Sequence, residues 1–344
     1  MTHPVRIQPA ERAYRALNNP VQPAECGPGV LATLATVNVD GDVGKELLMP
    51  PRGLFVGVTT LDVVQRVARR PGVDEKVVAQ RSDIAAGGPA AAAAITFGAL
   101  GGRSVLLSAL GPGPIGRLVA GKLAEAGVQV VDAWAAGADL SISAITVLDS
   151  TGQRSVVSRN AQDVTAVVPA GLSALVRAAD VVLIDGHHPD LALAAARAAQ
   201  TAGIPVVLDC GSAKPVYAGL VPLAVAAVCS ADFTVHGSAG FDAVSTALLA
   251  DGAGLVAMTA GSAPVRWRTW EAAGTVEVPA VAARDTLGAG DVLHGAVAFA
   301  RARGVADPQR SLSFGVAVAS LRVQHVGPRI WMDDQRLGAL VAQL

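Results

Sequence analysis

Short aliphatic runs alternate with longer Ala-rich segments along the chain from residue 54 onward. Because the aliphatic runs are continuous, they indicate strands buried on both faces of a mostly parallel sheet with helices on either side. The predicted strands are 54–59, 104–110, 128–132, 180–185, 204–209, 225–229 and 254–259. The predicted helices are 89–99, 116–126, 190–202, 239–250, 288–303 and 308–323. The pattern therefore predicts an α/β protein with a three-layer α/β/α core.

Two stretches break this alternation. Residues 73–84 are extended and more polar, and residues 140–159 have the pattern of a β-hairpin, so a small separate sheet is predicted. Residues 1–50 differ from the rest, because prolines interrupt them and they lack sustained periodicity. We expect a domain over 51–344 after an extension over 1–50, which is either dispensable or an arm that packs on the domain or on a partner subunit.

Composition narrows the classes of partner. The formal net charge is −1, so neither a nucleic acid nor a membrane surface is indicated. No apolar run approaches the roughly 20 residues of a membrane span, and the N-terminus lacks the charged-then-apolar pattern of a secretory signal. The three cysteines have no metal-ligand spacing, and their odd number argues against a disulfide framework. We therefore expect a cytoplasmic protein.

The segment from Arg284 to Asp291, Arg-Asp-Thr-Leu-Gly-Ala-Gly-Asp, carries the strongest chemical signal. It leads into a predicted helix, whose first N–H groups are unpaired and whose dipole is positive, so a negatively charged group can bind there. The carboxylate of Asp291 could then take a proton from a hydroxyl that attacks a bound phosphoryl group. The alternative is a tight turn followed by an ordinary first-turn acid.

The pattern Asp-Thr-x-Gly-Ala-Gly-Asp resembles the C-terminal signature of the ribokinase-like (phosphofructokinase-B, PfkB) carbohydrate kinases. The resemblance implies a kinase that uses ATP and Mg²⁺. It assigns the anion hole to the backbone of Gly288, Ala289 and Gly290, and the role of catalytic base to Asp291.

The resemblance also assigns a role to the small sheet. In ribokinase-like kinases such a sheet is a lid over the sugar and often the dimer contact, which here implies a lid at approximately 73–86 and 140–159 and a homodimer. A lid excludes water from a transferring phosphoryl group. Lys76 and Arg154 lie in this predicted lid and are candidates for substrate binding, with solvated surface charges as the alternative. The segment around Lys76 is similar to that of kinases of ketoses, including sulfonated fructose.

Three residues in the N-terminal half are candidates for sugar binding. Asp62 follows the first predicted strand, and ligands of open α/β sheets bind beyond the carboxyl ends of strands. Its carboxylate can accept hydrogen bonds from two sugar hydroxyls. Gly87 and Gly88 let the backbone approach a ligand closely, and they match the family's N-terminal signature. That signature usually continues with an Asn that reaches the sugar, and in this chain the position is Ala92.

The nucleotide is expected along the C-terminal half of the same edge. The candidate cofactor-binding residues are Gly288, Gly290, Ser230, Thr259, Gly261, Ala317 and Ser320. Asp209, at the end of a predicted strand, is a candidate for holding Mg²⁺ through water, or else a structural cap. The resemblance further implies a monovalent cation such as K⁺ near Asp285 and the backbone of 323–327.

Two other patterns suggest different chemistry. Residues 111–116 fit Gly-x-Gly-x-x-Gly, but two prolines remove N–H donors that a pyrophosphate would need, which argues against a nicotinamide cofactor. His187 and His188 are adjacent and point in different directions, so we reject a zinc site there. At least one of them is expected in the substrate pocket or as a cap.

The sequence as a whole predicts ATP-dependent phosphorylation of a hydroxyl of a sugar or sugar derivative. A ketose such as fructose, or a sulfonated or acidic sugar, is favoured. The alternatives are a nucleoside kinase of the same family and a non-catalytic protein that senses sugars or nucleotides. The few aromatic residues argue against the nucleoside kinase, and the intact Asp291 argues against the sensor.

Overall fold

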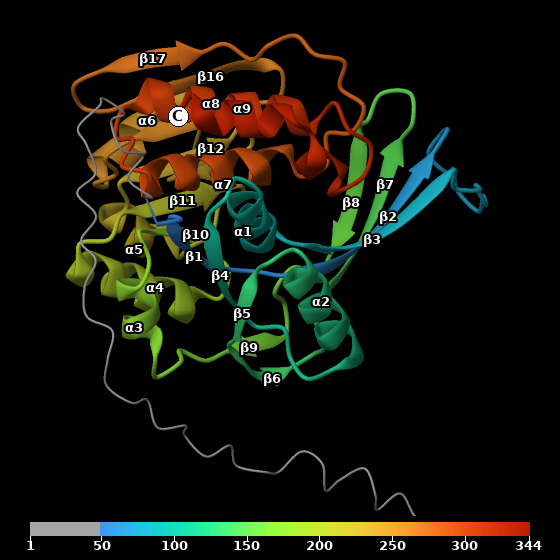
Figure 1. Ribbon diagram of the computed structural model, residues 1–344, viewed down its shortest axis with the longest axis horizontal. Helices are drawn as coiled ribbons and strands as arrows, with labels where there is room; N and C mark the ends of the chain where they lie inside the picture. The colour runs from blue at the N-terminus through green and yellow to red at the C-terminus, as the bar shows by residue number, and fades with distance from the viewer. Residues whose placement is uncertain (1–48) are drawn as a thin grey trace, which may run out of the picture. The chain divides into compact units, whose positions relative to one another are not determined.

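A large sheet of nine strands forms the centre of the protein (Figure 1). The structure is a computed structural model that describes residues 49–344, so nearly all of the predicted extension lies outside the described residues, as does Cys26. The strands of this sheet are β1 (Arg52–Val56), β4 (Arg103–Ser108), β5 (Gln129–Asp132), β10 (Val181–Ile184), β11 (Val206–Cys210), β12 (Ala226–Ser230), β15 (Val256–Ala260), β16 (Ala263–Arg268) and β17 (Ala273–Val276).

The order of the strands is β17-β16-β15-β12-β11-β10-β1-β4-β5. Every neighbouring pair is parallel except β15–β16 and β16–β17, which are antiparallel. The seven predicted strands all belong to this sheet. Strands β16 and β17 were not predicted, because they lie at one edge, where half of their residues face solvent and continuous aliphatic runs are not needed.

Helices cover both faces of the sheet (Figure 1). The long helices are α1 (Pro89–Ala99), α2 (Pro114–Glu125), α4 (Pro189–Ala202), α6 (Phe241–Ala250), α7 (Ala289–Ala302) and α8 (Pro308–Arg322). The short helices are α3 (Leu172–Arg177), α5 (Tyr217–Leu220) and α9 (Arg336–Ala342), with 3₁₀ turns η1 (Val221–Leu223) and η2 (Ile330–Asp333). Proline begins α1, α2, α4 and α8, where its missing N–H has no helical partner to lose.

The core consists of two main hydrophobic clusters, one on each face of the sheet. Helices α1, α2, α7, α8 and α9 pack on one face, and α3, α4, α5 and α6 pack on the other. The predicted three-layer α/β/α fold is confirmed. Within residues 49–344, no helix combines the length and the apolar character that a membrane span requires. The two described cysteines, Cys210 and Cys229, are buried and free.

A small sheet extends from the core (Figure 1, right). Its strands are β2 (Thr60–Val67), β3 (Arg81–Gly87), β7 (Ile142–Leu148) and β8 (Arg154–Ser158), in the order β3-β2-β7-β8. We predicted no strand over 60–67, which forms β2, one of the two inner strands of this sheet; of the predicted extended stretch 73–84, residues 73–80 contain no strand and β3 begins at Arg81. Buried and half-buried positions of β2 do not alternate regularly, and this segment is paired as a strand with β3 on one side and β7 on the other. Two short ribbons, β6 (Trp134–Gly137) with β9 (Val164–Ala166) and β13 (Thr234–Val235) with β14 (Ser238–Ala239), complete the strands.

The carboxylate of Asp185 joins three segments at the carboxyl end of the large sheet. It accepts hydrogen bonds from the N–H groups of Val58 (2.9 Å), Ala90 (3.2 Å) and His187 (2.9 Å), and it lies 3.0 Å from Nδ1 of His187. Burial alone would raise the pKa of Asp185, but the charge and hydrogen bonds of His187 and the N–H of Val58 outweigh it, so the pKa lies below its ordinary value. Asp185 therefore fixes the end of β1 and the start of α1 relative to β10.

We predict that Asp185→Ala lowers the free energy of unfolding by about 3 kcal/mol, because three buried donors lose their acceptor. Urea denaturation measures the change. Asp232→Ala is the matched control, since Asp232 is exposed, and its effect should stay within about 0.5 kcal/mol. A loss below about 1 kcal/mol for Asp185→Ala would show that Asp185 does not hold these segments together.

Candidate active site

A cavity of about 50 Å³ brings together predicted site residues from distant parts of the chain. Among the residues that line it are Asp62, Gly87, Gly88, Ala92, Gly288 and Asp291. The predicted sugar-binding residues and the predicted catalytic base therefore share one cavity. Ala92, where the family signature has an Asn, also faces it.

The start of helix α7 supplies the predicted anion hole. Gly288 has a left-handed conformation with φ of 73°, which favours glycine, and it precedes the first helical residue. Among the described residues, the N–H groups of Gly288 and Gly290 have no acceptor, whereas the N–H of Ala289 donates to the carbonyl of Thr286 at 3.3 Å. The N–H groups of Gly288 and Gly290 thus have no acceptor in this part of the structure, and binding of an anion by the backbone of Gly288, Ala289 and Gly290 stays a prediction.

Asp291 lies in the first turn of α7 and is half-buried. Burial and then the negative charge of Asp209 raise the pKa of its carboxyl to about 6, and the charges of His294 and Arg154 oppose that rise. At neutral pH the group is therefore mostly a carboxylate, the form that accepts a proton.

Asp209 and His294 lie next to Asp291. Oδ2 of Asp209 is 3.2 Å from Nδ1 of His294, whose Nε2 is 3.2 Å from the carbonyl of Val228. Because a carbonyl only accepts hydrogen bonds, Nε2 carries a hydrogen. One ligand atom each from Asp209, Asp291 and His294 lies within 4.8 Å of the others, a donor set that a divalent cation accepts. Sequence analysis missed His294, although its position one helical turn after Asp291 places both on one face of α7.

Asp62 is held at the cavity by local contacts. Thr60 donates its hydroxyl hydrogen to Oδ1 of Asp62 at 2.7 Å, while burial raises the pKa of the Asp62 carboxyl. A Cβ at Gly87 would lie 2.1 Å from Cγ of Asp62, far inside van der Waals contact. Only glycine at position 87 therefore leaves room for Asp62.

Arg329 is a cavity residue that sequence analysis missed. Its Nη2 donates to the carbonyl of Ala86 at 2.6 Å. Burial and the charge of nearby Arg322 lower the pKa of Arg329 to about 10, so it remains positively charged at neutral pH. A positive charge thus faces the same cavity as Asp62 and Asp291. The sequence signal was weak, since Arg329 lies 243 positions from Ala86, whose carbonyl it contacts.

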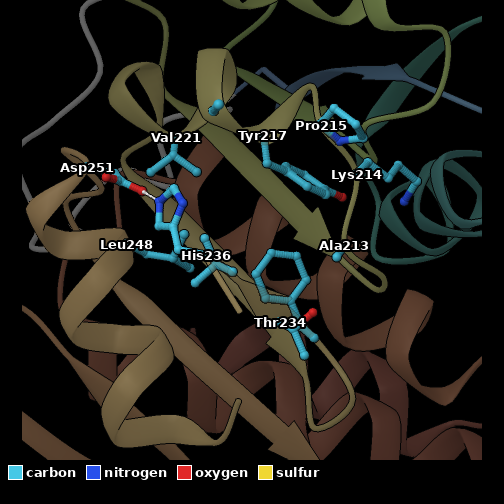
Figure 2. A pocket seen from close by; sticks show the side chains of 12 residues that line it. Ala213, Lys214, Pro215, Tyr217, Val221, Thr234, His236, Leu248 and Asp251 are labelled. Carbon is cyan, nitrogen blue, oxygen red and sulfur yellow. Dashed lines mark hydrogen bonds and ion pairs between the residues drawn. The ribbon is translucent and has the colours of Figure 1, made fainter. Parts of the chain in front are cut away.

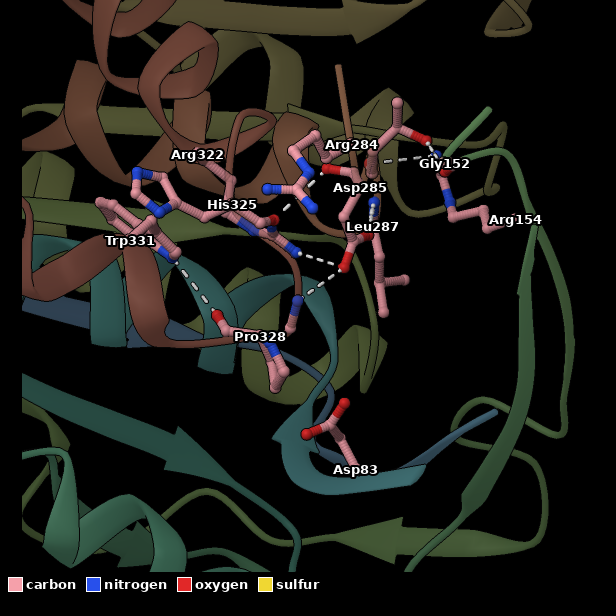
Figure 3. Close-up of polar contacts among 12 residues, drawn as sticks. Asp83, Gly152, Arg154, Arg284, Asp285, Leu287, Arg322, His325, Pro328 and Trp331 are labelled. Carbon is pink, nitrogen blue, oxygen red and sulfur yellow. Dashed lines mark hydrogen bonds and ion pairs between the residues drawn. The ribbon is translucent and has the colours of Figure 1, made fainter. Parts of the chain in front are cut away.

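The two predicted lid cations differ in position. Lys76 is exposed in the irregular stretch before β3 and does not line the cavity. Arg154, at the start of β8, lies with Nη1 3.4 Å from the carbonyl of Thr286, next to the anion hole. The carbonyl of Gly152 also accepts hydrogen bonds from the N–H (3.2 Å) and hydroxyl (2.9 Å) of Thr286 (Figure 3). The β7–β8 hairpin is therefore attached to the loop before α7.

The predicted nucleotide-binding residues lie on neighbouring elements. Ser230 of β12 and Thr259 of β15 are register partners at the carboxyl ends of adjacent parallel strands. Gly261, with φ of 63°, forms the turn between β15 and β16. Ala317 and Ser320 lie in the second half of α8, which packs on α7. Contact of these residues with a nucleotide stays a prediction.

Asp285 is the centre of a buried polar network (Figure 3). Its Oδ1 accepts the N–H of Leu287 at 3.0 Å, and its Oδ2 accepts the N–H of Gly327 at 3.0 Å. Nη2 of Arg322 lies 3.5 Å from Oδ2, and Nη1 donates to the carbonyl of His325 at 2.9 Å. The predicted site of a monovalent cation therefore contains a guanidinium.

A second cavity, of about 330 Å³, lies elsewhere and is shown in Figure 2. Tyr217, Phe233 and Lys214 line it, together with His236, whose Nε2 is 2.7 Å from Oδ2 of Asp251. None of the predicted site residues lines this cavity. The smaller cavity, which the predicted site residues line, is therefore the candidate active site.

Comparisons with known proteins show the family of this chain. The family described as pfkB family carbohydrate kinase matches residues 53–335. Ribokinase of Arabidopsis thaliana is 25% identical over 313 residues, which cover 83% of this chain and 79% of that protein.

Solved structures show the same fold. A crystal structure from Agrobacterium tumefaciens, provisionally named a ribokinase, has 28% identity and a TM-score of 0.73, covering 86% of this chain and 98% of that one. Arabidopsis thaliana ribokinase complexed with ribose and ATP has 22% identity and a TM-score of 0.66, covering 86% of this chain and 100% of that one. Since the family match spans most of its length, this chain belongs to the pfkB family of carbohydrate kinases, which are ATP-dependent phosphotransferases.

Proposed function

We propose that the protein transfers the γ-phosphoryl group of ATP to a hydroxyl of a sugar or sugar derivative, with Asp291 as the catalytic base. The observation that carries this proposal is the shared cavity of Asp291, Asp62 and the free amide of Gly288. The solved structure of the Arabidopsis ribokinase, which contains ribose and ATP, gives further support. A ketose such as fructose, or a sulfonated or acidic sugar, remains the favoured acceptor.

The sugar binds against Asp62, Gly87 and Gly88. Asp62 accepts hydrogen bonds from sugar hydroxyls, and the guanidinium of Arg329, which lines the same cavity, donates to oxygen atoms of the sugar. Asp291 accepts the proton of the attacking hydroxyl, and the amides of Gly288 and Gly290 stabilise the negative charge of the phosphoryl group during transfer.

The nucleotide binds along Ser230, Thr259 and Gly261, with Ala317 and Ser320 beside the adenine. Asp209 is the proposed holder of Mg²⁺ through water, since its buried Oδ2 accepts no hydrogen bond from the described residues. Mg²⁺ supplies charge neutralisation at the phosphates of ATP. Arg154, near Thr286, adds a positive charge on the lid side of the same site.

The residues around the cavity favour a sugar over a nucleoside. None of the described residues that line it is aromatic, whereas a nucleoside base calls for apolar or aromatic walls. Its polar groups are carboxylates and guanidinium groups, which suit hydroxyl-rich or acidic acceptors. The free amides beside Asp291 argue against a protein that only senses its ligand.

We expect Asp291→Asn to lower kcat about 10³-fold or more while ATP binding persists, because the amide cannot accept the proton. Wild type is first assayed for ATP consumption with fructose, ribose, 2-keto-3-deoxygluconate, sulfonated ketoses and nucleosides. Asp190→Asn, at an exposed position of α4, is the matched control and should keep wild-type turnover. Turnover of nucleosides alone would favour the nucleoside kinase, binding without turnover would favour the sensor, and an active Asp291→Asn would reject the base.

Gly87→Ala should raise the KM for the sugar about tenfold, because the added methyl displaces the Asp62 carboxylate. The KM for ATP should change little. Gly121→Ala in α2 serves as the control, since a Cβ there meets no atom within 4 Å. Steady-state kinetics on both variants measures the KM for the sugar and the KM for ATP separately. An unchanged KM for the sugar in Gly87→Ala would exclude Asp62 from sugar binding.

We also infer that two copies associate through the small sheet. Ile84, Val63, Ala144 and Val157 are successive register partners across β3, β2, β7 and β8, so they form an apolar row on one face. Ile84 is 52% exposed and Val157 75% exposed. An exposed apolar row of this kind is typical of a surface that another protein covers. A second copy of this chain presents the same row, so the two rows can pack against each other in a symmetric dimer.

Val157→Glu should therefore convert a dimer into a monomer in sedimentation velocity. Val73→Glu is the control, because Val73 is 95% exposed and lies outside the sheet, so its variant should remain dimeric. A wild-type protein that sediments as a monomer at micromolar concentration would contradict the inferred dimer.

A further inference from the structure

We propose that the guanidinium of Arg322 takes the place of the monovalent cation at Asp285, so that this kinase works without K⁺. The family resemblance implies a cation near Asp285 and the backbone of 323–327. The side chain of Arg322 lies among these same groups. The disagreement between the resemblance and this arrangement is the basis of the proposal.

Arg322 is the last residue of α8, and only 2% of it is exposed. Its Nη1 is 2.9 Å from the carbonyl oxygen of His325 and 3.5 Å from that of Asp285. Its Nη2 is 3.5 Å from Oδ2 of Asp285. One buried positive group thus faces two carbonyl oxygens and one carboxylate oxygen, the kinds of ligand that a hard cation uses.

Other oxygen atoms of this region already have donors. The carbonyl of Val323 accepts the N–H groups of Arg284 (2.7 Å) and Asp285 (3.1 Å). The two carboxylate oxygens of Asp285 accept the N–H groups of Leu287 and Gly327. Few lone pairs remain for a metal ion, which needs several oxygen ligands at once.

The local charges also oppose an added cation. Arg322 and Asp285 together have no net charge, and the carbonyl of Arg284 accepts a hydrogen bond from a second guanidinium, that of Arg66, at 2.8 Å. A K⁺ ion would bring a third positive charge into this poorly solvated region, where repulsion between charges is strong. Burial lowers the pKa of Arg322, but an arginine remains protonated at neutral pH.

Arg322 consequently acts as a positioning residue. By holding Asp285 and the carbonyl of His325, it fixes the loop that presents the amides of Gly288 and Gly290. A guanidinium of the chain itself holds the loop at every salt composition, whereas the occupancy of a site filled by a free ion depends on the concentration of that ion.

The test compares KCl with tetramethylammonium chloride at equal ionic strength, because tetramethylammonium is too large for a site lined by carbonyl oxygens. The thermal unfolding midpoint and the kinase activity of the wild type should agree in the two salts, within about 1 °C and about twofold. In Arg322→Ala, K⁺ should raise the midpoint by more than about 2 °C and restore part of the activity. The thermal unfolding midpoint is measured without a sugar, so this part of the test can be carried out even if no sugar in the assay is phosphorylated.

Arg322→Lys retains a positive charge and should stay insensitive to K⁺, whereas Arg303→Ala, at an exposed position, should behave as wild type. If Arg322→Ala does not fold, Arg322→Gln takes its place. A wild type that K⁺ activates about tenfold, or stabilises by more than about 2 °C, would overturn the proposal. A folded Arg322→Ala or Arg322→Gln without any response to K⁺ would overturn it as well.

Discussion

The conformation of residues 284–288 is the constraint on which the site depends. Asp285 accepts the N–H groups of Leu287 and Gly327, and so connects the start of α7 to the end of α8. With the loop held in this way, Gly288 adopts its left-handed conformation and the first amides of α7 point to one place. The carboxylate of Asp291 then lies beside those amides. A buried hydrogen-bond network therefore aligns the groups to which the proposal assigns the chemistry.

The balance of charge around the cavity follows from the same packing. Asp62 and Asp291 face it, and Asp209 lies behind Asp291, so three acids are crowded into a poorly solvated region. Burial raises the pKa of each of them. Arg329, which stays protonated at neutral pH, provides positive charge at the cavity, and Nδ1 of His294 lies 3.2 Å from Oδ2 of Asp209. The carboxyl of Asp291, the proposed catalytic base, is thus mostly ionised near neutral pH.

The small sheet is attached to the phosphate-binding loop. The carbonyl of Gly152, at the tip of the β7–β8 hairpin, accepts two hydrogen bonds from Thr286, and Arg66 of β2 donates to the carbonyl of Arg284. A movement of the small sheet over a sugar would therefore shift the loop before α7 and, with it, the first amides of that helix. This connection provides a physical route by which sugar binding can order the site for phosphoryl transfer.

The sequence by itself determined the α/β architecture and the candidate catalytic loop. Buried parallel strands require continuous aliphatic runs, and an anion-binding helix start with its acid requires only neighbouring residues, so both are visible locally. Tertiary structure alone decided the strand β2, which contains Asp62, and the positions of Arg322, Arg329 and His294. Arg329 contacts Ala86, 243 positions away in the chain. A half-exposed strand depends on its pairing, and a buried charge depends on partners brought together by folding, which no local pattern records.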